Sequence, residues 1–142
     1  MNKYIANLLL GLFSCFIFVS TTHAQSAVYI YKNPKTGEGD YMFTYGVPTI
    51  EDAEFLAQEK LIELGYTEDM IRKQASTKNK GYGLIIKSVL ENKYGRRITV
   101  FGVALGCKTK EQAQREALEN LKKYNPEWGG GKHTVVQRFI DR

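Results

Sequence analysis

An internal repeat organises most of this 142-residue chain. Six residues of the first half recur sixty positions later: Thr49, Glu51, Ala53, Ala57, Glu59 and Leu61 return as Thr109, Glu111, Ala113, Ala117, Glu119 and Leu121. Each copy follows an aromatic-Gly-Val step, at Tyr45–Val47 and at Phe101–Val103. Upstream of these steps the copies match at an offset of fifty-six, which implies four extra residues between strand and helix in the second copy. The chain is therefore expected to fold as a repeated strand-to-helix unit.

The first 24 residues have the order of a secretory signal. Lys3 is followed by an apolar run from Leu8 to Val19, and small residues precede Gln25. This order predicts a signal peptide over residues 1–24, cleaved after Ala24, and a periplasmic or secreted protein. A retained membrane anchor is an alternative, but the run is short for a span. Attachment of a lipid at Cys15 is the other alternative, disfavoured because the apolar run continues beyond it.

The remaining residues, 25–142, are enough for one domain with one core. They carry nineteen basic and fifteen acidic side chains, a net charge of +4, and the charges are interspersed along the chain. Cys107 is the only cysteine left after cleavage, so no intramolecular disulfide can form. Export argues against nucleic acid as a partner, and no transmembrane anchor is expected after cleavage.

Periodicity and turn residues predict the elements. Strands are expected at 28–32, 41–47, 84–90, 97–105 and 133–140, and helices begin at Thr49 and Thr109, whose side chains can cap backbone N–H groups. A short helical piece is expected over 67–75, followed by a polar loop. The order is ββα-ββα-β, a single α+β domain of two repeats, 28–66 and 84–125, plus a C-terminal strand.

This order predicts a ferredoxin-like two-layer sandwich, with an antiparallel sheet of about five strands and both helices on one face. Strand alternation divides the side chains between two faces. The set suited to lie under the helices is Met42, Thr44, Gly46, Ile98, Val100 and Gly102. The other face, aromatic with a cation and a hydroxyl, is the candidate ligand-binding face: Tyr41, Phe43, Tyr45, Arg97, Thr99 and Phe101. The alternative is that these rings form the core.

Trp128 precedes three glycines and is a further candidate ligand-binding residue, as a side chain that closes over a ligand. The alternative is a turn in which Trp128 caps the edge of the core. Cys107 is interpreted as a small buried residue at a helix entrance, and His133 as a solvated strand-end histidine, because no metal-ligand spacing surrounds it. No motif of an enzyme, cofactor site or metal site is present, so a non-enzymatic protein is expected.

The first copy, Tyr45 to Glu54 ending with Leu64-Gly65-Tyr66, resembles the first half of a SPOR domain, the sporulation-related peptidoglycan-binding repeat. Arg97 to Val103 followed by Thr109 to Ala113 is similar to the second half. The βαββαβ order of that family also matches the chain from Tyr41 to Ile140. SPOR domains bind glycan strands stripped of peptide on the sheet face away from the helices, so the resemblance implies that the aromatic face binds glycan. The lengthened second strand-to-helix step departs from the family.

The sequence thus predicts an exported, non-enzymatic binding module whose partner is an envelope glycan or an envelope protein. The leading hypothesis is a module that binds peptidoglycan glycan strands through an open aromatic sheet face. The alternative is a protein-interaction module, such as a periplasmic inhibitor or immunity protein, with its binding surface on one edge or loop near Trp128.

Overall fold

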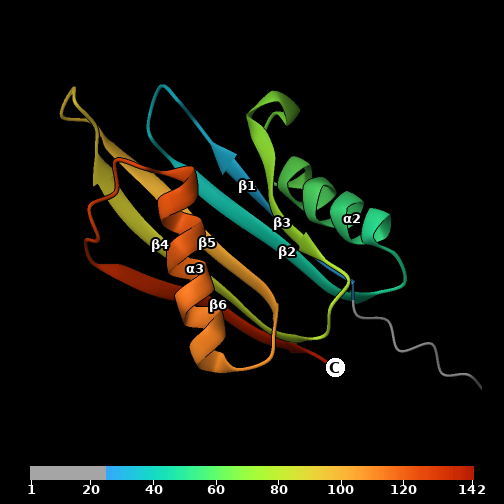
Figure 1. Cartoon of the computed structure of the whole chain (residues 1–142). Helices are drawn as coiled ribbons and strands as arrows, with labels where there is room; N and C mark the ends of the chain where they lie inside the picture. The colour runs from blue at the N-terminus through green and yellow to red at the C-terminus, as the bar shows by residue number, and fades with distance from the viewer. Residues whose placement is uncertain (1–24) are drawn as a thin grey trace, which may run out of the picture.

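The computed structural model describes residues 25–142 as an α+β protein (Figure 1). Its elements are β1 (Gln25–Lys32), β2 (Gly39–Val47), α2 (Ile50–Glu63), the 3-10 turn η1 (Glu68–Met70), β3 (Ile71–Thr77), β4 (Gly81–Glu91), β5 (Arg97–Cys107), α3 (Lys110–Tyr124) and β6 (His133–Asp141). The predicted α+β class is confirmed. The predicted signal peptide, its cleavage after Ala24 and the alternative at Cys15 lie outside the described residues.

The strands form two antiparallel sheets of three strands, with the orders β2-β1-β3 and β5-β4-β6. The prediction of one sheet of about five strands is therefore wrong. Each half of the chain builds one sheet from the order ββαβ, in which the first strand is central and the last strand returns to its free edge. The C-terminal strand is thus the third strand of the second half rather than an addition to two repeats.

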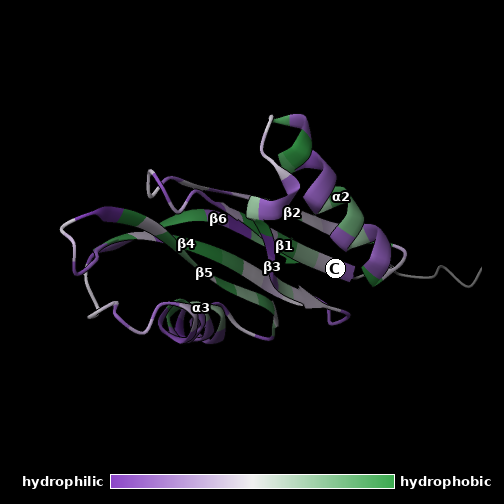
Figure 2. Ribbon diagram, turned by 90° about the horizontal axis from the view of Figure 1, so that it is seen from above, coloured by the Kyte–Doolittle hydropathy of each residue, from purple (hydrophilic) through white to green (hydrophobic). Residues whose placement is uncertain are grey.

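The two sheets pack face to face, and one helix covers the outer face of each (Figure 2). The layer between the sheets contains Val28, Ile30, Ile85, Phe101 and Val103. Ala113, Ala117 and Leu121 of α3 pack on β4 and β5, while Leu61 of α2 packs with Tyr31 and Ile71. The expected arrangement with both helices on one face is wrong, because each sheet has its own helix and the sheets cover each other's second face.

Strand β3 occupies residues predicted to be partly helical. The segment 67–75 instead forms the turn η1 and then β3, which pairs with β1 from Ser26 opposite Thr77 to Tyr31 opposite Ile71. β1 is apolar and central, and leaving one of its edges unpaired would bury backbone N–H and C=O groups without partners. Tertiary pairing therefore overrides the weak local helix signal.

The strands of the two halves can be aligned with each other by their β-bulges. One bulge lies in β2 between Thr44 and Val47, and its counterpart lies in β5 between Ala104 and Cys107. Residues of β2 and β5 therefore match at an offset of sixty, the same as in the helices. The predicted offset of fifty-six in the strands is wrong, because the extra residues lie in the longer β4–β5 hairpin. Residues related by this alignment are called matched positions below.

Both helices begin as the sequence predicts. Oγ1 of Thr49 accepts a hydrogen bond from the backbone N–H of Asp52 at 3.0 Å, and Oγ1 of Thr109 accepts one from Gln112 at 3.0 Å. The matched glycines Gly46 and Gly106, with φ of 69° and 64°, turn the chain from strand toward helix in a conformation that favours glycine. No helix within residues 25–142 has the length and apolar character needed to cross a bilayer.

Buried polar contacts join the two halves. The Asp141 carboxylate is 4% exposed and accepts hydrogen bonds from Oγ of Ser26 at 2.8 Å and from the backbone N–H of Gly46 at 3.3 Å. On the other side of the sandwich, the Gln74 side chain donates to the carbonyl of Phe101 and to Oδ1 of Asn120. These contacts fix the position of one sheet on the other.

Candidate functional site

The predicted aromatic binding face lies between the two sheets. Phe101 is 1% exposed, and its ring packs against that of Tyr41 with centroids 5.6 Å apart. Tyr41 and Phe43 are half-buried beside the same layer. The predicted division of side chains between the two faces is correct for Met42, Val100 and Phe101, whereas Gly46 faces Asp141 of the second sheet instead of the helix. The aromatic face is not open, because the second sheet covers it. The alternative that these rings form part of the core is correct for Phe101.

An aromatic stack closes the edge of the sandwich where β2 passes β6. The rings of Phe43 and Tyr45 each stack on Phe139, with centroids 5.1 Å and 5.0 Å apart. The Phe139 ring fits there because Gly83 has no side chain to displace it. Tyr45 is 48% exposed, so it is the predicted aromatic residue that most clearly reaches solvent.

The other predicted site residues lie elsewhere. Arg97 is exposed and Thr99 half-buried at the hairpin end of β5, where the Thr99 N–H donates to the carbonyl of Gly37. Trp128 is 8% exposed in the α3 core, and its Nε1–H donates to Oγ of Ser88 at 3.0 Å. Trp128 thus matches the structural alternative and does not stand at a solvent-exposed rim. The seven predicted residues do not converge on one open site.

The two halves carry net charges of opposite sign, which the total for the whole chain does not show. Residues 25–77 carry nine acidic and five basic side chains, a net charge of −4. Residues 78–142 carry fourteen basic and six acidic side chains, a net charge of +8. The charges are interspersed along the chain, but their sums have opposite signs in the two halves. The second half presents a positive field that attracts anions.

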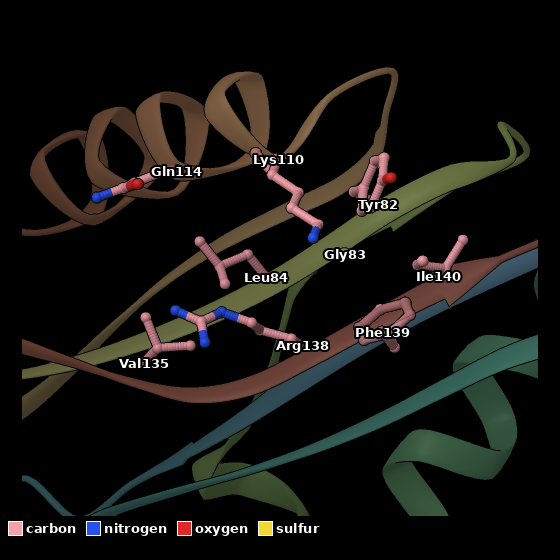
Figure 3. Close-up of a pocket in the computed structure, with 10 residues that line it drawn as sticks. Tyr82, Gly83, Leu84, Lys110, Gln114, Val135, Arg138, Phe139 and Ile140 are labelled. Atoms are coloured by element: carbon pink, nitrogen blue, oxygen red, sulfur yellow. The ribbon is translucent and has the colours of Figure 1, made fainter.

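A groove of about 480 Å³ opens in the basic half between α3 and strand β6 (Figure 3). Side chains that line it are Tyr82, Leu84, Lys110, Gln114, Val135, Arg138 and Ile140. Tyr82, Leu84, Val135 and Ile140 give it an apolar floor, and Val135 and Ile140 are 37% and 42% exposed. Lys110 reaches from the first turn of α3 toward the sheet, and Arg138 lies along β6. We call this the α3–β6 groove.

The groove exists because α3 is seated to one side of its sheet. α3 packs mainly on β5, less on β4, and hardly touches β6, whereas α2 packs on β1 and β2 and also contacts β3. Gly102 explains the seat of α3, because a Cβ there would collide with the carbonyl of Ala117 and approach Cβ of Leu121 to 2.7 Å. The matched position in β2 is Met42, whose side chain packs in the α2 core.

A second difference between the two halves leaves the helix-side face of β6 uncovered. In the first half, Nζ of Lys73 on β3 lies 2.8 Å from Oε1 of Glu54 on α2 and ties the helix to the edge strand. The matched residues in the second half are Val135 and Gln114, which line the groove without this ion pair. The helix-side face of β6 is therefore open while that of β3 is bridged.

Cys107 lies buried where α3 begins. Burial and the nearby Glu116 carboxylate raise the pKa of Cys107 to about 12, and its thiol donates to Oε2 of Glu116 at 3.3 Å. Cys107 is 1% exposed at the entrance to α3, as the sequence predicted. Within residues 25–142 no group of three or more His, Cys, Asp or Glu side chains is arranged to hold a metal ion.

Sequence reasoning missed Tyr82, Lys110 and Arg138. A signal for them was available, since alternation along the last strand puts Arg138 and Ile140 on one face, and charge counted by halves singles out the second half. The groove itself was not predictable, because it depends on where α3 sits relative to β6.

No family model matches this chain, no curated protein matches it, and no solved structure matches it.

Proposed function

We propose that this protein is a non-enzymatic, exported binding module that holds an anionic glycan strand of the cell envelope in the α3–β6 groove. The observation that carries the proposal is the groove itself, an apolar floor flanked by Lys110 and Arg138 in the half with a net charge of +8. Aromatic and aliphatic side chains suit the apolar faces of sugar rings, and cations suit their carboxylates.

Three of the side chains that line the groove have positions suited to binding a sugar or its carboxylate. Tyr82 rises from β4 beside the loop that enters α3 and offers a flat ring to a sugar. Arg138 presents a planar guanidinium that can bind a carboxylate through two hydrogen bonds, and Lys110 adds a second, more flexible charge. The cations lie on opposite sides of the groove, so a strand between them can contact both.

The resemblance to SPOR domains points to the same class of ligand. Hydrolysing the amide that joins peptide to glycan places a free carboxylate directly on the sugar and removes the bulk of the peptide. A groove with cations beside an apolar floor suits a strand that carries its carboxylate on the sugar ring. Because the face used by SPOR domains is covered here by the second sheet, the proposed site lies on the helix side of β6 instead.

The test is a pull-down of residues 25–142 on purified sacculi before and after amidase treatment. We expect binding to rise after peptide removal and to fall at least about tenfold in Lys110→Gln/Arg138→Gln, a loss of about 1.4 kcal/mol. Lys35→Gln/Lys60→Gln is the matched control, because it removes two exposed charges from the acidic half.

Equal binding by the two double variants would contradict the groove as the site. Absence of binding to either form of sacculus would contradict the choice of glycan. The protein-interaction alternative would then lead, and the exposed apolar side chains Phe55 and Leu56 on α2 favour it.

A further inference from the structure

The outer side of α2 carries two large apolar side chains in solvent. Phe55 is 61% exposed and Leu56 is 40% exposed. Glu51, Asp52 and Glu59 lie one turn before or after Phe55, so acidic residues are its neighbours on this side of the helix. α2 as a whole has five acidic side chains and one basic side chain. We call Glu51, Asp52, Phe55, Leu56 and Glu59 the acidic α2 face.

The fold does not require this face to be apolar. The matched positions on α3 are Arg115, which is exposed, and Glu116, which accepts hydrogen bonds from Cys107 and Gln112. The two helices occupy equivalent places on their sheets, and one of them is polar where the other carries Phe55 and Leu56. An apolar group that packing does not demand is a candidate for contact with a partner.

The α3–β6 groove has the complementary character. Its exposed apolar side chains, Val135 and Ile140, lie on either side of Arg138 along β6, and Lys110 reaches toward them from α3. The acidic α2 face has exposed apolar side chains among carboxylates, and it belongs to the half with a net charge of −4, whereas the groove belongs to the half with +8. Helices with an apolar stripe commonly bind in apolar grooves, and opposite charge selects the pairing.

A single copy cannot make this contact with itself. α2 covers the outer face of the first sheet and α3 covers the outer face of the second, so the α2 face and the groove belong to opposite layers of the sandwich (Figure 2). We propose that the acidic α2 face of one copy docks in the α3–β6 groove of a second copy. The contact joins two different surfaces, so it builds a head-to-tail chain or a closed ring.

The contact between copies does not depend on glycan being the ligand, because it joins two surfaces of the same chain. If glycan does bind in the groove, it competes with the second copy. Added glycan would then separate associated copies, and association would mask the groove until the glycan is present.

The experiment measures the mass of residues 25–142, which contain the whole described fold, by sedimentation velocity at low salt. We expect mass to rise with concentration up to about 1 mM, where a contact with a Kd of that order is substantially formed. Salt should reverse the association, because screening weakens the attraction between the two surfaces.

Two variants each remove one side of the contact. Phe55→Arg copies the arginine that α3 carries at the matched position, and Lys110→Glu/Arg138→Glu reverses the charge of the groove. Each variant alone should remain monomeric. Their equimolar mixture should form a one-to-one dimer and nothing larger, because the intact groove of the first binds the intact α2 face of the second.

A wild-type chain that stays monomeric at about 1 mM overturns the proposal. Wild-type association without a dimer in the mixture also overturns it, because the contact would then join other surfaces. Circular dichroism and thermal unfolding show whether each variant is folded. If the groove variant fails to fold, Lys110→Gln/Arg138→Gln replaces it, with the same expected outcome.

Discussion

In the first half of this protein α2 lies across β1 and β2 and is joined to β3 by the Glu54–Lys73 ion pair, whereas in the second half α3 lies on β5 and leaves β6 open. The strand order and the places of the bulges are the same in both halves. A few side chains on a common scaffold therefore decide whether the space beside a helix is filled or becomes a groove.

The halves also differ in how they meet solvent. α2 is acidic and exposes Phe55, while α3 has Arg115 at the matched position. The inner sides of the two helices are alike, since Ala53, Ala57 and Leu61 match Ala113, Ala117 and Leu121 and all six are buried. Packing preserves the inner side, so the outer side is where the halves can acquire separate roles.

The largest expected effect tests whether the two cores are equivalent. Leu61 and Leu121 are both 0% exposed, so Leu61→Ala and Leu121→Ala should each lower the free energy of unfolding by about 2–5 kcal/mol. Urea denaturation measures both. A loss below about 1 kcal/mol for either would show that its helix is not anchored by the matched leucine.

The next effect concerns the seat of α3. Gly102→Met gives β5 the residue that β2 has at Met42, and its Cβ collides with the backbone of α3. We expect a loss of about 1–3 kcal/mol and a displaced helix, seen as amide chemical-shift changes along α3. Met42→Leu is the control and should cost less than about 1.5 kcal/mol. If Gly102→Met is neutral, close approach to Gly102 does not hold α3 in place.

A third change transfers the ion pair of the first half to the second. Gln114→Glu/Val135→Lys should bridge α3 to β6, and we expect it to weaken glycan binding in the sacculus pull-down while changing stability by less than about 1 kcal/mol. Gln114→Glu alone is the control for added charge. Unchanged glycan binding by the double variant would show that the groove is not the binding site.

The smallest effect is the pH dependence of the ion pair. The hydrogen bond from Lys73 lowers the pKa of Glu54, so the contribution of Glu54 is complete above its unfolded pKa of about 4.3 and is lost as pH falls through the lower folded pKa. The contact is partly exposed, so the contribution should be below about 1 kcal/mol. Comparing wild type with Glu54→Gln by urea denaturation at several acidic pH values measures it. A difference that grows on acidification would contradict this sign.

Local signals in the sequence predicted much of the fold. Thr49 and Thr109 mark both helix starts, and alternation separated Met42 from its neighbours Tyr41 and Phe43 correctly. The error was to leave the aromatic face open. Whether a face made of such rings meets water or another sheet depends on the number and pairing of sheets, and β3 showed no strand periodicity of its own.

The sequence by itself determined the α+β class, the helix starts, the two side-chain faces of the strands and the buried place of Cys107, because these follow from local spacing and chemistry. Only the tertiary structure decided that the strands divide into two sheets, that Phe101 lies between them, and that Lys110 and Arg138 flank one groove. Those features arise from contacts between residues far apart in the chain, where a single glycine such as Gly102 shifts a helix and no local pattern records the result.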